Sequence, residues 1–180
     1  SVHGKDEIKA VVEVLKHSTQ MGKNVLNFEK KIAKLFNKKY GLMVNSGSSA
    51  IMLAMESLNL PQGSEIITPV LTFSTTVSYI VRNKLTPVFV DVKEGTYCID
   101  ENKIKDLITK KTRAILAPHL MGNIVNWKKL SPILRKNNII IIEDSADTLG
   151  ATYQGRSTGH YADISITSFY GSHIINCAGN

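Results

Sequence analysis

The sequence contains few cysteines and no long hydrophobic run. Among its 180 residues there are two cysteines, five prolines and one tryptophan. Cys98 and Cys177 lie far apart and match no zinc-binding or disulfide pattern, so we expect no metal site and a reducing compartment, the cytoplasm. No apolar stretch approaches the roughly 20 residues that a transmembrane helix needs. The first residues also lack the apolar segment of a secretory signal, so the sequence predicts a cytoplasmic protein with no membrane partner.

The composition is that of a globular domain with an excess of positive charge. Apolar residues make up 43% of the chain, and the net charge is +7. Five lysines gather on one predicted helix and just after it: Lys30, Lys31, Lys34, Lys38 and Lys39. A basic patch is one feature of nucleic-acid-binding domains. However, Phe28, Ile32 and Leu35 give the same helix an apolar stripe, which is typical of a helix with one solvated face. We therefore predict no nucleic-acid partner.

Short apolar runs alternate with amphipathic stretches along most of the chain. The sequence predicts strands at Tyr40–Val44, Glu65–Thr68, Thr86–Asp91, Arg113–Pro118, Ile139–Glu143 and Asp163–Phe169. It predicts helices at Asp6–His17, Asn27–Phe36, Ser48–Leu58, Ser74–Arg82, Asp100–Thr109 and Asn126–Lys136. This alternation predicts an α/β fold with a mostly parallel sheet flanked by helices. We expect an N-terminal helical segment over residues 1–39 and a larger α/β domain from residue 40 to 180, which stops without a terminal helix or cap.

Ligands of parallel sheets bind at the carboxyl ends of the strands, so the polar residues that follow each predicted strand are candidates for a site. The first group is Asn45-Ser46-Gly47-Ser48-Ser49-Ala50, which opens a predicted helix. Unpaired N–H groups of Ser48, Ser49 and Ala50 would bind a phosphate there, assisted by the helix dipole. The alternative is a serine that caps the helix and closes a tight turn.

Three further groups follow later strands. Glu143-Asp144-Ser145-Ala146-Asp147 comes after a strand of isoleucines, and a buried carboxylate needs a cationic partner such as a protonated cofactor ring, unless it only caps a helix. Ser168 ends another strand and His173 follows five residues later, as a candidate general base. Phe73 would cover a planar ring or belong to the core. The other histidines are expected to be structural: His3, His17, His119 and His160.

Taken together and in this order, these motifs resemble the DegT/StrS sugar aminotransferases. These are pyridoxal-phosphate (PLP) enzymes of fold type I, the aspartate-aminotransferase fold. The resemblance runs from about Gly4 to Asn180 and rests also on Pro87–Asp91 and on Gly150-Ala151. It implies that residues 40–180 are the first part of the PLP-binding large domain. Because family chains are longer, the C-terminal small domain is expected to be absent from this chain.

The resemblance also assigns roles to individual residues. It implies that small residues hold the cofactor phosphate: Gly47, Ser48, Ser49 and Ser168. It implies that Phe73 stacks on the pyridine ring and that Asp144 pairs with the protonated ring nitrogen, which makes the ring an electron sink. Asp147 lies where the aminotransferases usually carry Gln or His, near the ring hydroxyl, so we expect it to be a cofactor-binding residue too.

His173 is the main departure from the aminotransferase pattern. The aminotransferases carry their Schiff-base lysine at this position, and here no lysine follows Lys136. Histidine cannot form that bond, but it can move a proton. The chain is similar in this respect to the 3-dehydratase branch, which includes GDP-4-keto-6-deoxy-D-mannose 3-dehydratase and uses pyridoxamine phosphate (PMP) without a covalent link.

The branch implies a function for the chain. We expect a dehydratase that removes the C3 hydroxyl of a nucleotide-linked 4-keto-6-deoxyhexose in deoxysugar (polysaccharide or O-antigen) biosynthesis, with His173 as catalytic base. Glutamate is the implied amino donor, and the family implies a homodimer. Ser145 and Ala146 stand where an iron–sulfur version carries cysteines, so a cluster is not expected. The alternatives are a 4-keto-sugar aminotransferase with an unusual base and a non-catalytic domain of the same fold.

Overall fold

A computed structural model describes residues 3–20 and 22–177 of the chain. The helices are α1 (Lys5–His17), α2 (Lys23–Leu35), α3 (Gly47–Ser57), α4 (Ser74–Arg82), α5 (Ile104–Leu107), α6 (Trp127–Lys136) and a 3-10 turn, η1 (Leu120–Gly122). The strands are β1 (Glu65–Pro69), β2 (Thr86–Val90), β3 (Thr112–Pro118), β4 (Ile140–Asp144), β5 (Thr152–Tyr153), β6 (Arg156–Ser157) and β7 (Ile164–Ile166). Helices and strands alternate from α3 to β4, and five of the strands form a parallel sheet, so the predicted α/β class is confirmed.

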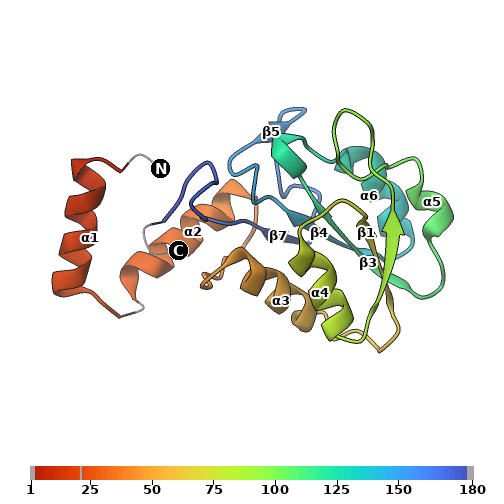
Figure 1. The fold of residues 1–180 in the computed structure, drawn as a ribbon, viewed down its shortest axis with the longest axis horizontal. Helices are drawn as coiled ribbons and strands as arrows, with labels where there is room; N and C mark the ends of the chain where they lie inside the picture. Colours follow the sequence, from red (N-terminus) through yellow and green to blue (C-terminus); the bar gives the residue numbers. More distant parts are fainter. Residues whose placement is uncertain (1–2, 21, 178–180) are drawn as a thin grey trace.

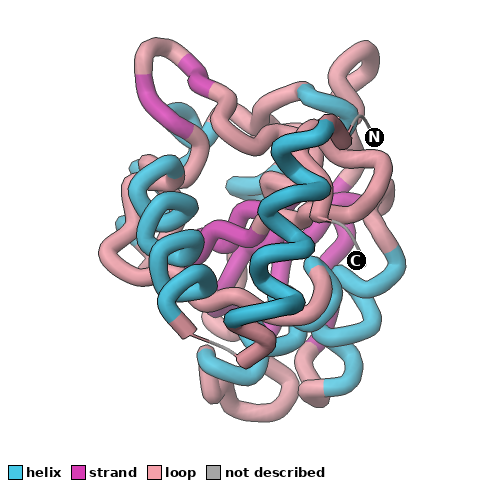
Figure 2. The backbone as a smooth tube through the Cα atoms, turned by 90° about the vertical axis from the view of Figure 1, so that its left-hand side faces the viewer, coloured by secondary structure: helices cyan, strands magenta, loops and turns pink. Residues whose placement is uncertain are grey.

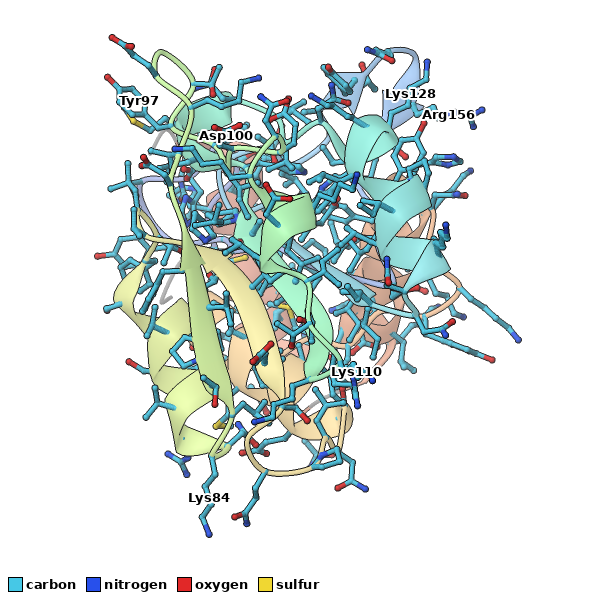
Figure 3. The ribbon with its side chains drawn as sticks, turned by 90° about the vertical axis from the view of Figure 1, so that its right-hand side faces the viewer. Lys84, Tyr97, Asp100, Lys110, Lys128 and Arg156 are labelled. Carbon is cyan, nitrogen blue, oxygen red and sulfur yellow. The ribbon has the colours of Figure 1, made fainter. Side chains whose placement is uncertain are left out.

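Five strands form one parallel sheet in the order β2-β1-β3-β4-β7. The strand order reverses between β1 and β3, and in such sheets ligands bind outside the carboxyl ends of the strands. Figure 3 shows these ends toward the top, where Tyr97 and Arg156 lie in segments that follow β2 and β4. Lys84, which precedes β2, lies at the opposite end of the molecule (Figure 3).

Helices cover both faces of the sheet, with α3 and α4 on one side and α6 on the other (Figure 1). On β4, Ile142 is buried with residues of α3 and α4, whereas its neighbour Ile141 is buried with residues of α6. Successive side chains of a strand point to opposite faces, so a strand covered on both sides is apolar throughout. Each isoleucine that is fully buried contributes about 1.5–3 kcal/mol. The buried isoleucines of β4 therefore hold the backbone in place for the acidic residues that follow them.

The predicted strand at Tyr40–Val44 is wrong. This segment is extended, but it pairs with no strand in the part of the chain that the structure describes. One of its backbone groups is satisfied by a side chain instead: the Met43 N–H donates to Oε1 of Glu29 on α2, at 2.8 Å. A cavity of about 390 Å³ separates this segment from β7. Residues 40–44 therefore have the composition of a strand, but no neighbouring strand lies close enough to pair with them.

Two other predicted elements are shorter in the structure. The helix predicted at Asp100–Thr109 covers only Ile104–Leu107, because Oδ1 of Asp100 accepts the N–H of Asn102 and holds the first residues in turns. The strand predicted at Asp163–Phe169 ends at Ile166, where its partner β4 also ends, at Asp144. The hairpin of β5 and β6 was not predicted from the pattern, and Figure 2 shows it as a projecting loop at the top.

The first helix stands apart from the sheet (Figure 1). Its apolar residues Ile8, Val11, Val12 and Leu15 are exposed, and α1 has no buried residue. The next helix, α2, approaches the sheet through Phe28, whose ring lies 4.9 Å from that of Phe169. No helix within residues 3–20 and 22–177 is both long and apolar enough to cross a membrane.

Candidate functional site

The N-terminus of α3 lies at the carboxyl edge of the sheet and is capped by Ser46. The side-chain oxygen of Ser46 accepts the N–H of Ser49 at 3.1 Å, and its carbonyl accepts the N–H of Ala50 at 3.0 Å. The prediction of unpaired N–H groups is therefore wrong for Ser49 and Ala50, because the capping serine that we weighed as an alternative satisfies both. The N–H of Ser48 makes no hydrogen bond within the described residues and remains a donor for a ligand.

A close approach between Gly47 and Ser168 joins this helix to the end of β7. A Cβ atom on Gly47 would lie only 3.1 Å from Cβ of Ser168, which is tighter than an ordinary contact. Glycine therefore allows the Ser168 hydroxyl to lie beside the first turn of α3. The Ser48 hydroxyl, in turn, lies 3.4 Å from that of Thr75 on α4, a residue that sequence reasoning did not select. Hydroxyl donors beside the positive end of a helix dipole suit a phosphate dianion.

Asp144 ends β4 and is almost completely buried, with 8% of its surface exposed. Its only side-chain hydrogen bond within the described residues comes from the N–H of Ala146, at 3.0 Å. Desolvation raises the pKa of this carboxyl, and Asp147 raises it further, whereas the bond from Ala146 and the nearby His119 and His173 lower it. A raised pKa means that the surroundings of Asp144 do not compensate the charge of its ionised form. A cationic ring nitrogen would supply that charge.

Behind Asp144 lies a buried pair that the sequence did not reveal. Glu143 is fully buried, and its Oε1 accepts hydrogen bonds from the hydroxyls of Ser145 and Ser165, at 3.2 and 3.1 Å. Its Oε2 lies 3.4 Å from Nε2 of His119, which is itself buried. Nδ1 of His119 accepts the N–H of Val125 at 3.0 Å, so the ring proton belongs on Nε2, facing Glu143. His119 is therefore structural, as predicted, but it stands directly behind the site.

His173 lies in a tight turn after β7, where its N–H donates to the carbonyl of Tyr170 at 2.9 Å. Its Nδ1 is 3.4 Å from Oδ1 of Asp147. The other oxygen of Asp147, Oδ2, accepts the N–H of Met121 at 3.0 Å. The structure thus brings together His173 and Asp147, which the sequence selected separately. The turn after β3, which the sequence did not select, contacts the other oxygen of Asp147 through the N–H of Met121.

Phe73 follows β1 at the start of α4 and is 65% exposed. The alternative of an ordinary core aromatic is therefore wrong, and the ring is free to cover a ligand. The cavity of about 390 Å³ beside β7 is a separate feature. It is lined mainly by apolar side chains such as Phe28, Ile32 and Leu42. Asn45, Ser46 and Ala50 of the first candidate group also line it, but none of the residues to which the resemblance assigns a role does.

Comparison with known proteins agrees with this arrangement. The sequence profile of the DegT/DnrJ/EryC1/StrS aminotransferase family matches residues 2–180. The chain belongs to this family. The resemblance on which the site residues were chosen is therefore confirmed at the level of the family.

The individual relatives include both dehydratases and an aminotransferase, the two kinds of enzyme between which the residue at position 173 is expected to distinguish. The chain is 38% identical over 178 residues to a dTDP-4-dehydro-2,6-dideoxy-D-glucose 3-dehydratase of Saccharopolyspora spinosa, covering 94% of this chain and 38% of that protein. It superimposes on the GDP-4-keto-6-deoxy-D-mannose-3-dehydratase of E. coli with bound hydrated PLP, with a TM-score of 0.92, 34% identity, and coverage of 98% of this chain and 47% of that one. It also superimposes on an aminotransferase of Psychrobacter cryohalolentis, with a TM-score of 0.91, 33% identity, and coverage of 97% and 45%. The chain thus spans less than half the length of these three proteins and shares the fold of the two solved structures.

Proposed function

We propose that the protein carrying this chain is a PLP/PMP-dependent dehydratase that removes the C3 hydroxyl of a nucleotide-linked 4-keto-6-deoxyhexose. One observation carries the proposal: a histidine, His173, stands where the family pattern places the Schiff-base lysine, and the last lysine among residues 1–180 is Lys136. Lys136 itself ends α6, on the side from which β4 begins, so it is no substitute. Two of the proteins compared above are named 3-dehydratases, in line with this proposal.

The described residues fit the cofactor. The close approach of Gly47 to Ser168, which puts the Ser168 hydroxyl beside the first turn of α3 and near Ser48, suits its phosphate. Ser49 would add less, because its hydroxyl and N–H already contact Ser46. The buried Asp144 suits a protonated ring nitrogen, and the exposed Phe73 suits a stacked ring. When bound, PMP supplies an amine for a sugar ketone and a ring that accepts electrons from a carbon that loses a proton.

His173 would act as the base at Nε2, because its Nδ1 faces Asp147. A base held at one ring nitrogen can take a proton at the other and return it to the departing hydroxyl. The ring is largely shielded, with 19% of the side chain exposed, which limits competition from water. Loss of the C3 hydroxyl, rather than gain of an amine at C4, follows if no lysine returns a proton to C4.

The test is covalent capture of the cofactor. We expect PLP to bind this protein without a covalent bond, because no lysine occupies the position of His173. Borohydride treatment followed by denaturation should then leave no pyridoxyl group on the protein, as measured by intact mass. The His173→Lys variant is the matched control and should be labelled at the new lysine. A label on an active-site lysine of the unaltered protein would contradict the dehydratase and leave an aminotransferase.

An aminotransferase with an unusual base remains the second candidate, because the chain matches a solved aminotransferase almost as well as a solved dehydratase. The two candidates give different products, a 4-amino sugar and a 3-deoxy sugar, and mass spectrometry of the product separates them. A non-catalytic domain would bind neither PLP nor PMP, and an absorbance titration with each cofactor would show this.

The phosphate subsite gives a second prediction. Replacing Ser48 and Ser168 together by Ala removes two hydroxyl donors to a dianion, each worth about 1.5–3 kcal/mol, so the dissociation constant for PMP should rise at least tenfold. Fluorescence titration measures it. Ser57→Ala, at the far end of α3, is the control, because the Ser57 hydroxyl only donates to the carbonyl of Ala54. An unchanged constant in the double variant would place the phosphate elsewhere.

We further propose a homodimer, with glutamate as the amino donor that regenerates PMP. Large apolar side chains that follow β1, β3 and β7 are exposed near the site: Val70, Leu71, Met121 and Tyr170. A second copy that covered them would remove this apolar surface from water. Sedimentation of the whole protein tests the dimer, and PMP formation from PLP and glutamate tests the donor.

A further inference from the structure

Asp147 connects three loops at the carboxyl edge of the sheet. It lies in the loop after β4, and its two carboxylate oxygens reach residues of two other loops. Oδ1 lies 3.4 Å from Nδ1 of His173, in the turn after β7. Oδ2 accepts the N–H of Met121, in the turn after β3, at 3.0 Å. The carboxylate is therefore held in place on the side opposite to the histidine.

The backbone of Met121 shows how specific this arrangement is. Met121 has φ 54° and ψ 34°, the left-handed region that residues other than glycine, Asn and Asp seldom adopt. The turn is closed by a hydrogen bond from the N–H of Asn123 to the carbonyl of Leu120, at 3.0 Å. Its conformation places the Met121 N–H on Asp147. Backbone conformations of this kind cost about 1–3 kcal/mol and persist where surrounding contacts hold them.

We propose that Asp147 is a positioning residue, whose carboxylate keeps the imidazole proton of neutral His173 on Nδ1 and leaves Nε2 unprotonated toward the site. A histidine has two distinct ring nitrogens, and the partner of one decides which of them carries the proton. Carboxylates that orient a catalytic base act in this way. Both oxygens of Asp147 already have partners in the protein, which favours this role over the contact with the cofactor hydroxyl that the family resemblance implies.

The effect of Asp147 on catalysis rests on the proposed function, but its effect on the tautomer of His173 does not. Acidic groups near the His173 ring are Asp147 and Asp144, and the ring of Tyr170 lies 6.1 Å away on the same turn. Of these, Asp147 makes the direct contact with Nδ1. Asp144 is turned to the N–H of Ala146. Removing the charge of Asp147 should therefore change which nitrogen of the His173 ring carries the proton, whereas removing a remote charge should not.

The first experiment determines the tautomer of His173 in the ligand-free whole protein. Long-range ¹H–¹⁵N spectra of histidine-labelled protein, with the His173 signals assigned from their loss in His173→Asn, should show the Nδ1–H form when the ring is neutral. In Asp147→Asn, the amide can still accept from Met121 but can also donate to Nδ1, so the signals should move to the Nε2–H form. Asp91→Asn, in an exposed ion pair with Lys103, is the control and should leave them unchanged. An Nε2–H form in the unaltered chain, or no change in Asp147→Asn, would overturn the proposal.

The second experiment separates this inference from the proposed function. In the whole protein, Asp147→Asn should lower kcat by about 10²–10⁴-fold with little change in KM, and Asp147→Glu should recover part of the loss. If the tautomer shifts as expected and kcat does not fall, Asp147 positions the ring but His173 is not the base, and the catalytic role that the proposed function gives to His173 fails. If kcat falls while the tautomer is unchanged, the positioning role of Asp147 fails.

Discussion

Replacing Asp144 with Asn should make the ligand-free chain more stable while it removes most of the activity of the whole protein. The side chains are nearly the same size, and the amide oxygen can still accept the N–H of Ala146. Burial raises the pKa of Asp144, so between the ordinary pKa of an Asp and this raised value the folded chain binds more protons than the unfolded one. The free energy of unfolding therefore falls as the pH rises through that window, and above it the ionised carboxylate is destabilising.

The expected effect on stability follows from this fall in the free energy of unfolding with rising pH. At neutral pH, Asp144→Asn should have a higher melting temperature than the unaltered chain, and the difference should shrink as the pH is lowered through the same window. Thermal unfolding at several pH values measures this. Asp106→Asn, on the exposed side of α5, is the control and should show no such gain. A lower melting temperature for Asp144→Asn would mean that the protein itself stabilises the charge.

The activity result rests on the ring nitrogen. Without a carboxylate, the bound ring would lose the charge that keeps its nitrogen protonated and hence its capacity to accept electrons. Removal of one preorganised electrostatic partner costs on the order of 10²–10³-fold in kcat, and we expect a loss of at least that size. PMP should still bind, because the residues that we propose to hold its phosphate are unchanged. Near-normal turnover in Asp144→Asn would remove Asp144 from this role.

Sequence patterns located β1 to β4 to within one or two residues, because strands buried on both faces are continuous apolar runs. The same signal failed at residues 40–44. Those residues have the composition of a strand, but a strand also needs a neighbour, and the pattern of one segment carries no information about what lies beside it. The ends of predicted elements failed where side chains intervene, as Asp100 does before α5.

The candidate site was predictable only in part, for a related reason. Ser168 and His173 follow β7, Asp144 ends β4, and Gly47 follows the extended segment at 40–44; family resemblance supplied the roles that are expected of them. His119 directly follows β3 and Glu143 is the penultimate residue of β4, but only the register of β3 beside β4 brings them to 3.4 Å. The contact of Asp147 depends on a left-handed turn at Met121, a residue type that gives no local signal for that conformation.

His173→Asn should nearly abolish the proposed dehydration in the whole protein. Asn approximates the size of the ring but cannot take a proton near neutral pH, and general-base catalysis is worth roughly 10²–10⁴-fold. PMP and the nucleotide sugar should still bind, because the described residues that would hold the phosphate and the ring nitrogen are unchanged. Isothermal titration measures the binding, and release of the 3-deoxy product measures the turnover. His160→Asn, in the loop before β7, is the matched control and should turn over normally.

The His173→Lys variant distinguishes a lost base from a damaged site. A lysine here should restore covalent capture of PLP and can return a proton to C4, so some of the flux should move from the 3-deoxy sugar to the 4-amino sugar. A variant that binds PLP covalently and makes the amino sugar would show that the rest of the site is intact and that residue 173 decides between the two reactions. Full dehydratase activity in His173→Asn would mean that another group removes the proton, because an amide side chain has no basic atom with which to do so.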